Sequence, residues 1–273
     1  MAFTFVKYGT KIDFIGKRRV AYGISLALLL IGLASALWGN GLKLGIDFAG
    51  GLIVQIQFQR AVADEDLKTS LGSTLLPDVT IQSFDEGGRD YLLRLSASDA
   101  DAAALRARIS DALKSAFPGN AAEIRRLEVV GPKVGEDLTN KALAALYYAV
   151  LLMAVYISGR FEQRWMASAL MAAVLWGGMY LLGLTDLGMG TLVILALGIT
   201  LAVCFFLKLN FAFGAVVGLL HDVLITVGLL SLLKVEIDLN VLAAIMTIIG
   251  YSINDTIIIY DRLRENLRSG EKL

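Results

Sequence analysis

Residues 211–260 read FAFGAVVGLLHDVLITVGLLSLLKVEIDLNVLAAIMTIIGYSINDTIIIY. Two apolar runs in this stretch, 211–233 and 239–260, are each long enough to cross a bilayer as a helix. The first run contains the polar pair His221-Asp222, and the second contains Asn254-Asp255. An ionisable side chain within hydrocarbon is costly, and it usually faces a protein interior and marks an ion or proton path. The stretch therefore predicts a membrane hairpin with a functional polar seam.

Further apolar runs lie on the N-terminal side of this hairpin. The chain has 273 residues, of which 56% are hydrophobic, and they come in long blocks rather than in the mixed pattern of a soluble domain. Four more blocks are compatible with transmembrane helices: 20–39, 141–158, 166–184 and 191–207. The sequence therefore predicts a polytopic α-helical membrane protein of about six transmembrane helices, with spans 141–207 preceding the hairpin at 211–260.

The placement of the basic residues predicts the topology. Lysine and arginine flank one side of the predicted spans: Lys7, Lys11, Lys17, Arg18, Arg19, Arg160, Arg164, Lys208, Arg262, Arg264, Arg268 and Lys272. By the positive-inside rule, segments 1–19 and 261–273 are both cytoplasmic, which agrees with an even number of crossings. We expect a multi-pass membrane protein. The formal net charge of zero gives no indication of nucleic-acid binding.

The first apolar block has a second interpretation. Lys17-Arg18-Arg19, an apolar run and Ala34-Ser35-Ala36 are also compatible with a cleaved signal peptide. The run is longer than the core of about 7–15 residues that is usual in signal peptides, so we expect an uncleaved membrane anchor.

A polar segment, 42–137, separates the first two spans and is expected on the outer face. Alternating apolar and polar residues predict half-buried strands at 52–59 and 91–96. The full pattern predicts strands at 52–59, 79–84, 91–96 and 123–130, and helices at 64–76 and 100–117. The order βαββαβ predicts a ferredoxin-like sandwich, in which two helices cover one face of an antiparallel sheet.

Several motifs resemble those of the SecF family, accessory membrane subunits of the bacterial Sec protein-export machinery. Residues 45–51 (GIDFAGG) resemble its G-x-D-F-T-G-G segment, and 130–135 (VGPKVG) its V-G-P-x-V-G segment. The stretches 160–162 (RFE), 215–226 (AVVGLLHDVLIT) and 247–266 (TIIGYSINDTIIIYDRLREN) are also similar to the family's. The motif residues singled out are Gly45, Asp47, Phe48, Gly50, Gly51, Gly131, Pro132, Gly135, Arg160, Phe161 and Arg262.

Three features depart from the family pattern. Ala49 stands where the family usually has threonine, and residues 163–210 form an extra pair of spans between the family's second and third. The family also continues with two more spans and a T-L-x-R-T segment, whose arginine is thought to work with the intramembrane aspartate. No such segment follows Asn266 in this sequence. Either the form is truncated or divergent, or the extra hairpin substitutes for the later one.

The polar pairs suggest proton coupling. A carboxyl group buried in a low dielectric favours its neutral form and can therefore carry a proton. Asp255, which aligns with the family's aspartate, is the main candidate; Asn254 can donate hydrogen bonds to it. His221 is a weaker candidate, and Asp222 is expected to bond a neighbouring helix. Small residues at Gly214, Gly218 and Gly250 predict a tight helix seam that the two acids face.

The resemblance implies an accessory subunit of the Sec translocase that uses the proton motive force to promote late steps of export. It implies a place in the bacterial inner membrane, with the segment 42–137 in the periplasm. It also implies SecD, the SecY/SecE/SecG channel, unfolded secretory polypeptide and lipid as partners. Two alternatives stay open: a structural subunit without energy coupling, and a proton-coupled exporter of small molecules. The sequence contains no phosphate-binding loop, and Cys204 is its one cysteine, so we expect no enzyme, cofactor or metal site.

Overall fold

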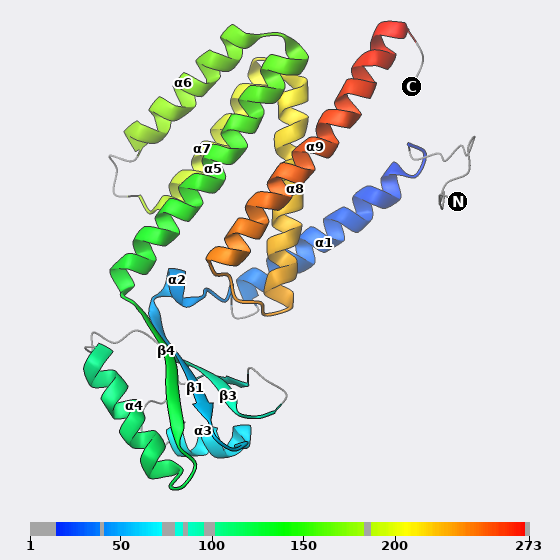
Figure 1. Cartoon of the computed structure of the whole chain (residues 1–273). Coiled ribbons are helices and arrows are strands. Elements are labelled where there is room, and N and C mark those ends of the chain that lie inside the picture. Colours follow the sequence, from blue (N-terminus) through cyan, green and yellow to red (C-terminus); the bar gives the residue numbers. More distant parts are fainter. Residues whose placement is uncertain are drawn as a thin grey trace, which may run out of the picture.

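The computed structural model describes residues 15–38, 41–72, 80–83, 87–95, 102–182 and 187–270. A bundle of long helices stands on one side of a small sheet domain (Figure 1). The end of α1 (Arg18–Trp38), the start of α5 (Pro132–Glu162) and the loop between α8 (Asn210–Leu232) and α9 (Leu239–Ser269) lie on the side of the bundle next to this domain. The sheet domain is called the outer domain below, following the predicted topology.

The outer domain contains all six predicted elements in the predicted order. Its strands are β1 (Gly51–Phe58), β2 (Thr80–Ser83), β3 (Asp90–Leu95) and β4 (Ala122–Val130), and its helices are α3 (Asp64–Gly72) and α4 (Ala102–Ala116). The strand order is β2-β3-β1-β4, and every neighbouring pair is antiparallel. This arrangement is the predicted ferredoxin-like sheet. Ser98 and Asp99, which are candidate caps for the helix predicted at 100–117, lie outside the described residues.

One face of the sheet forms the core of the outer domain. Alternate residues of β1, among them Val54 and Ile56, are fully buried. Leu67 from α3 and Ile109 from α4 pack in the same cluster, so both helices cover this face. Period-two burial in the strand and same-face burial in the helices are the patterns that the sequence predicted.

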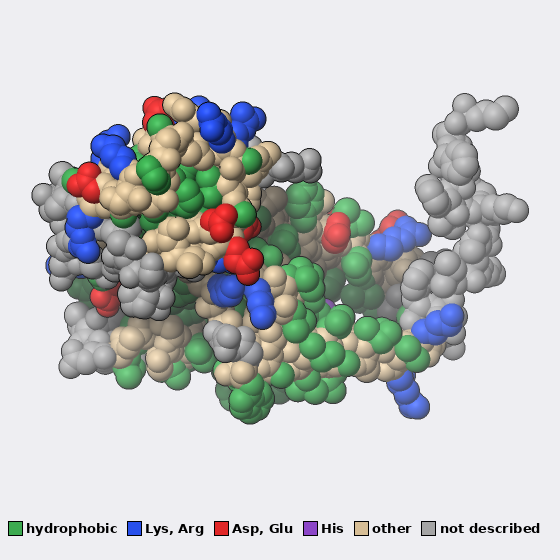
Figure 2. All heavy atoms as spheres, turned by 90° about the horizontal axis from the view of Figure 1, so that it is seen from below, with side chains coloured by type: hydrophobic (Ala, Val, Ile, Leu, Met, Phe, Trp, Pro, Cys, Tyr) green, Lys and Arg blue, Asp and Glu red, His purple; other side chains and the backbone are tan. Residues whose placement is uncertain are grey.

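The membrane part consists of α1, α5, α6 (Trp165–Leu182), α7 (Met189–Phe206), α8 and α9. Five of these helices, α1, α5, α7, α8 and α9, are long and apolar enough to cross a membrane, and α6 is a shorter apolar helix (Trp165–Leu181). A helix therefore lies at each of the six predicted spans, and five of the six meet the length and hydropathy expected of a membrane crossing. Seen from the side of the outer domain, charged side chains gather over that domain, while the helices beside it present mainly hydrophobic side chains (Figure 2).

Helices α5 to α9 share one apolar core, whose buried members include Leu151, Met171, Ala196, Leu219 and Ile249. The hairpin of α6 and α7 contributes buried residues to this core and is thus an integral part of the bundle. Helix α1 stands apart from the core and packs along α8.

Two boundaries differ from the prediction. Helix α5 begins at Pro132, immediately after β4, instead of near residue 141, because Pro132 suits the first turn of a helix. Helix α9 continues to Ser269, so most of the predicted cytoplasmic tail at 261–273 is helical. Its polar turns are held by contacts with α5, described below. A short helix, α2 (Ile46–Ala49), also lies within the GIDFAGG segment, where no helix was predicted.

Candidate functional site

The first polar pair joins α8 to α9. The hydroxyl of Ser252 donates a hydrogen bond to Oδ2 of Asp222 over 2.7 Å. Nδ1 of His221 lies 2.9 Å from Oδ1 of the same carboxylate. The Asp222 side chain is half-exposed, but both of its oxygens have a polar partner. Asp222 therefore bonds a neighbouring helix.

The second polar pair lies elsewhere on α9. Asn254 and Asp255 are exposed, and within the described part of the chain no hydrogen bond or ion pair reaches the Asp255 carboxylate. The buried stripe of α9 consists of Ile245, Ile249 and Ile253. Asp255 follows Ile253 by two residues, which is about 200° around the helix. The prediction that both acids face the α8–α9 seam is therefore wrong for Asp255.

The prediction that three glycines allow tight packing of the helix seam is wrong for two of them. A Cβ atom added at Gly218 or Gly250 would meet no described atom within 4 Å, so neither glycine allows a close approach of helices in the described chain. Gly214 does have a close neighbour, the hydroxyl of Tyr260, which would lie 2.5 Å from an added Cβ. It makes room for a side chain from α9 rather than for a helix backbone.

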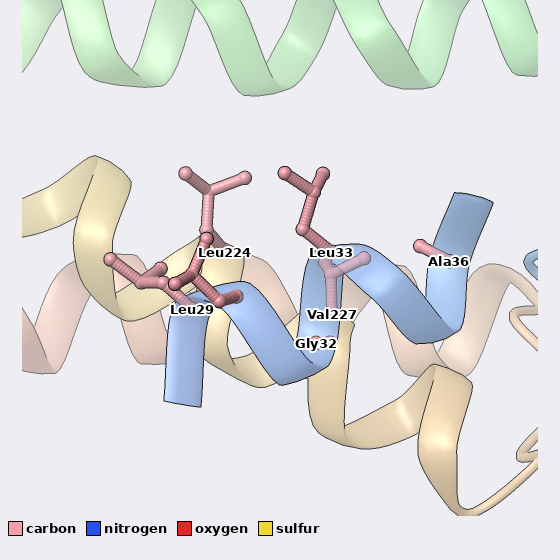
Figure 3. A pocket seen from close by; sticks show the side chains of 8 residues that line it. Leu29, Gly32, Leu33, Ala36, Leu224 and Val227 are labelled. Carbon is pink, nitrogen blue, oxygen red and sulfur yellow. The ribbon is translucent and has the colours of Figure 1, made fainter. Parts of the chain in front are cut away.

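The close backbone contact occurs between α1 and α8. A Cβ atom added at Gly32 would lie 2.8 Å from the Cα atom of Gly228, and the reverse addition gives 2.7 Å. Beside this contact the hydroxyls of Ser35 and Ser231 are 3.0 Å apart. Figure 3 shows the apolar groove along the crossing, where residues of α1 meet Leu224 and Val227 of α8. The sequence analysis missed this pair.

The R-F-E motif forms a cluster with the last turns of α9. Nη2 of Arg160 lies 2.8 Å from Oδ2 of Asp261 in an ion pair. The ring of Phe161 packs against those of Phe211 and Tyr260, with centroids 5.6 Å away in each case. The guanidinium groups of Arg160 and Arg264 also lie over the Phe161 ring. The cluster fixes the end of α5 to α9. The predicted motif residue Arg262 lies outside it and pairs with Glu265 on the surface.

Glu162 closes the same cluster towards α8. Its carboxylate accepts hydrogen bonds from the backbone N–H of Phe211, over 2.9 Å, and from the hydroxyl of Ser158. Ser158 in turn accepts one from Ser168 near the start of α6. Glu162 thereby provides an acceptor for the N–H of Phe211, which is one of the N–H groups in the first turn of α8 that lack a partner within the helix. One acidic residue thus links α5, α6 and α8.

The GIDFAGG segment packs on the start of α5. Gly50 and Gly51 have φ angles of 73° and 148°, which favour glycine. A Cβ atom on Gly135 would lie 2.8 Å from the carbonyl oxygen of Phe48, so Gly135 allows this close approach. Gly131 precedes Pro132 as the N-terminal cap residue of α5.

The same segment also contacts the start of α9. The backbone N–H of Gly45 donates to the carbonyl of Ile237 over 2.8 Å. The carboxylate of Asp47 accepts a hydrogen bond from the N–H of Leu239 over 3.0 Å. The sequence analysis identified the motif but not these partners, since they lie 192 residues away in the chain.

No group of three or more residues able to hold a metal ion occurs among the described residues. The arrangement is one of helix contacts, helix caps and one exposed acid, Asp255, on the apolar helix α9.

Comparisons with known proteins agree with the motifs. The family described as "Protein export membrane protein SecD/SecF, C-terminal" matches residues 108–184 and 182–273, and "SecD/SecF GG Motif" matches 35–62. Protein translocase subunit SecF of Magnetococcus marinus is 36% identical over 262 residues, which is 95% of this chain and 69% of that protein. The SecF subunit of Pseudomonas aeruginosa is 33% identical over 96% of this chain and 69% of its own length.

A solved structure is also similar. The crystal structure of SecDF from Thermus thermophilus, whose title describes a translocon-associated membrane protein, matches with a TM-score of 0.59 and 25% identity. The match covers 95% of this chain but only 29% of that longer chain. Together these findings confirm the resemblance drawn from the motifs: the chain belongs to the SecD/SecF family of protein-export membrane proteins.

Proposed function

We propose that this chain is an accessory subunit of a bacterial protein translocase that uses the proton motive force to promote late steps of export across the inner membrane. Family membership supports the translocase role, because the relatives that cover most of the chain carry the name Protein translocase subunit SecF. Both termini are cytoplasmic in this proposal, as the distribution of lysine and arginine favours.

The open position of Asp255 carries the proposal for energy coupling. Asp255 lies six residues before Asp261, which corresponds to about 9 Å along the helix axis from the Arg160–Asp261 ion pair towards the membrane. A charged carboxylate facing lipid at this depth is costly. It must therefore be neutralised by a proton or covered by another membrane protein.

A groove next to Asp255 supplies a surface for such a cover. It lies between α5 and α9 and is lined by Leu152, Met153, Tyr156, Gly250, Ile253, Asn254 and Ile257. A helix of a partner membrane subunit, which we propose is SecD, would fit along this mostly apolar groove and bring a polar group to Asp255. Gly250 presents only backbone there, which allows a close approach.

Proton exchange at Asp255 would then change how α9 and the partner helix pack. One charge moving through the membrane potential supplies about 2.3 kcal/mol per 100 mV, which is enough to shift a two-state packing equilibrium substantially. We propose that the outer domain responds to this change while it contacts unfolded polypeptide leaving the SecY/SecE/SecG channel.

The test uses membrane vesicles that contain the chain together with its partner subunits. Asp255→Asn should abolish the acceleration of late export by a proton gradient, while export without a gradient and copurification of the subunits stay as in the wild type. Glu265→Gln is the matched control, because it removes a carboxylate from the same helix outside the membrane. A normal gradient response of Asp255→Asn would overturn the proposal.

A structural role is the second candidate, and the Asp222–Ser252 bond favours it because it shows an acid of this bundle used as a helix contact. If Asp255 only bonds a partner helix, Asp255→Asn is silent in export, whereas Asp255→Leu lowers the amount of copurified complex. The two variants therefore separate the two functions.

A further inference from the structure

Three segments meet where the outer domain joins the helices. They are the motif turn 45–51, the first turns of α5 at 131–139, and the loop 234–238 that precedes α9. We call this meeting point the outer junction. The motif turn contacts each of the other two segments through hydrogen bonds or close backbone packing, so the junction is more than a covalent linker.

Asp47 is the side chain that ties the motif turn to α9. The first N–H groups of a helix lack partners within the helix. In α9, Asp238 accepts a hydrogen bond from the N–H of Val241 over 2.8 Å, and Asp47 accepts the one from Leu239. The negative charge of Asp47 also lies at the positive end of the helix dipole. A residue next to the outer domain thus caps the helix that carries Asp255.

Backbone hydrogen bonds and an ion pair reinforce this contact. The N–H of Ile237 donates to the carbonyl of Lys43, and the N–H of Gly45 donates to the carbonyl of Ile237, so the two segments pair like short strands. On the side of the outer domain, Arg94 of β3 forms an ion pair with Glu236 of the loop. The sheet itself is therefore bonded to the loop before α9.

Helix α5 is bound on the other side of the motif turn. Gly135 packs against the backbone of Phe48 and Gly50 at distances that leave no room for a side chain. The hydroxyl of Thr139 donates a hydrogen bond to the carbonyl of Gly135 in its own helix, and it lies 3.4 Å from the carbonyl oxygen of Phe48. Because β4 continues directly into α5, this contact also limits rotation of the outer domain about its linker.

From these contacts we propose that the outer junction makes the outer domain and the outer ends of α5 and α9 a single rigid unit, and that Asp47 is the positioning residue that holds α9 in it. Any displacement of α9 along or about its axis is then passed directly to the outer domain. This inference goes beyond the proposed function and does not require proton coupling, since it concerns only which parts move together.

Hydrogen exchange on the full chain in nanodiscs tests the role of Asp47. Loss of a helix cap should raise amide exchange in the first turn of α9, residues 239–241, by about fivefold in Asp47→Ala. Asp47→Asn keeps an acceptor oxygen and should restore most of the protection. Asp66→Ala is the matched control, because Asp66 is an exposed acid on α3.

Spin-label distances test the rigid unit itself. With Cys204 replaced by alanine, labels at Glu123→Cys on β4 and Tyr251→Cys on α9, both exposed, report the position of the outer domain relative to α9. The wild-type junction should give one narrow distance distribution, and Asp47→Ala combined with Arg94→Glu should broaden it. Adding Glu236→Arg should narrow it again, because the ion pair is rebuilt with reversed charges.

Two results would overturn the inference. One is a broad distribution with the wild-type junction, which would mean that the domain already moves freely. The other is a distribution that stays narrow in Asp47→Ala with Arg94→Glu, together with unchanged exchange at 239–241. If a variant fails to fold, two conservative variants still test the proposal: Asp47→Asn, and Arg94→Glu combined with Glu236→Arg. Both should retain the narrow distance distribution, and its loss in either variant contradicts the proposal.

Discussion

Helix α8 meets two of its neighbours, α1 and α9, in opposite ways. Towards α1 it presents Gly228, and the two backbones approach so closely that no side chain fits between them. Towards α9 it presents Asp222, whose carboxylate bonds Ser252 across the gap. One side of the helix is held by backbone packing beside an apolar groove, and the other is held by a polar bond.

This difference separates a fixed contact from an adjustable one. Packing of glycine backbones tolerates no displacement without steric clash or loss of dispersion contacts. A hydrogen bond between a serine and a half-exposed carboxylate can break and re-form at moderate cost. We therefore expect α1 and α8 to move together and the α8–α9 contact to adapt when α9 shifts.

The largest expected effect is the loss of the α1 contact in Gly228→Leu. A leucine cannot fit where a Cβ atom already lies 2.7 Å from the backbone of Gly32. The probe is a cysteine pair, Ser35→Cys with Ser231→Cys in a Cys204→Ala chain, because the native hydroxyls are 3.0 Å apart. Oxidation should join the pair readily in the parent and hardly at all in Gly228→Leu.

Gly218→Leu is the control on the same helix. The Cβ position of Gly218 has no described atom within 4 Å, so the leucine should leave disulfide formation unchanged. Equal disulfide yields in Gly228→Leu and Gly218→Leu would show that the close backbone contact does not hold α1 against α8.

A smaller change of the same kind is Gly228→Ala. The added methyl group overpacks the crossing and should destabilise the protein by about 1–3 kcal/mol. Gly218→Ala should instead be neutral or stabilising by about 0.5–1 kcal/mol, since alanine loses less entropy than glycine in a helix. Unfolding by sodium dodecyl sulfate in mixed micelles measures both. A reversed order would restore the packing role that the sequence assigned to Gly218.

The residues explain why close helix packing was predicted at Gly214 and Gly218 but occurs at Gly32 and Gly228. Gly214 and Gly218 have the spacing of a packing motif, but spacing places two glycines on one face without showing which helix that face meets. Gly32 and Gly228 have no local signal, because their pairing depends on how α1 docks on α8. By contrast, the strands and helices of the outer domain follow from local periodicity, which the sequence contains directly.

The position of Asp255 illustrates a signal that the sequence did contain. Ile245, Ile249 and Ile253 recur every four residues and mark the buried side of α9. Asp255 falls on nearly the opposite side by the same periodicity. The family motif predicted that Asp255 is functionally important, but it did not predict which side of α9 the residue occupies. The partners of Asp47 and Glu162, in contrast, could not be read from local pattern, since each bonds a backbone N–H that is distant in the chain.

On the polar side of α8, Asp222→Ala should have a moderate effect. It removes the acceptor of Ser252 and the neighbour of His221, and interhelical hydrogen bonds in membranes contribute about 0.6 kcal/mol on average and about 1.7 at most. We expect a loss of about 1–2 kcal/mol in the same mixed-micelle unfolding experiment, with Asp222→Asn losing less because it keeps an acceptor oxygen. A silent Asp222→Ala would show that the polar side contributes nothing to holding α9.

The smallest expected effect is that of Ser252→Ala, about 0.6 kcal/mol. Thr247→Ala is its control on the same helix, since the Thr247 hydroxyl bonds only the carbonyl of Ala243 one turn back. The double variant with Asp222→Ala measures the pair itself. Its loss of stability should be smaller than the sum of the two single losses by the energy of the shared bond. Full additivity would mean that Asp222 and Ser252 act independently. Helix α9 would then be held against α8 by its isoleucine stripe alone, and the adaptable polar contact inferred for this side would not exist.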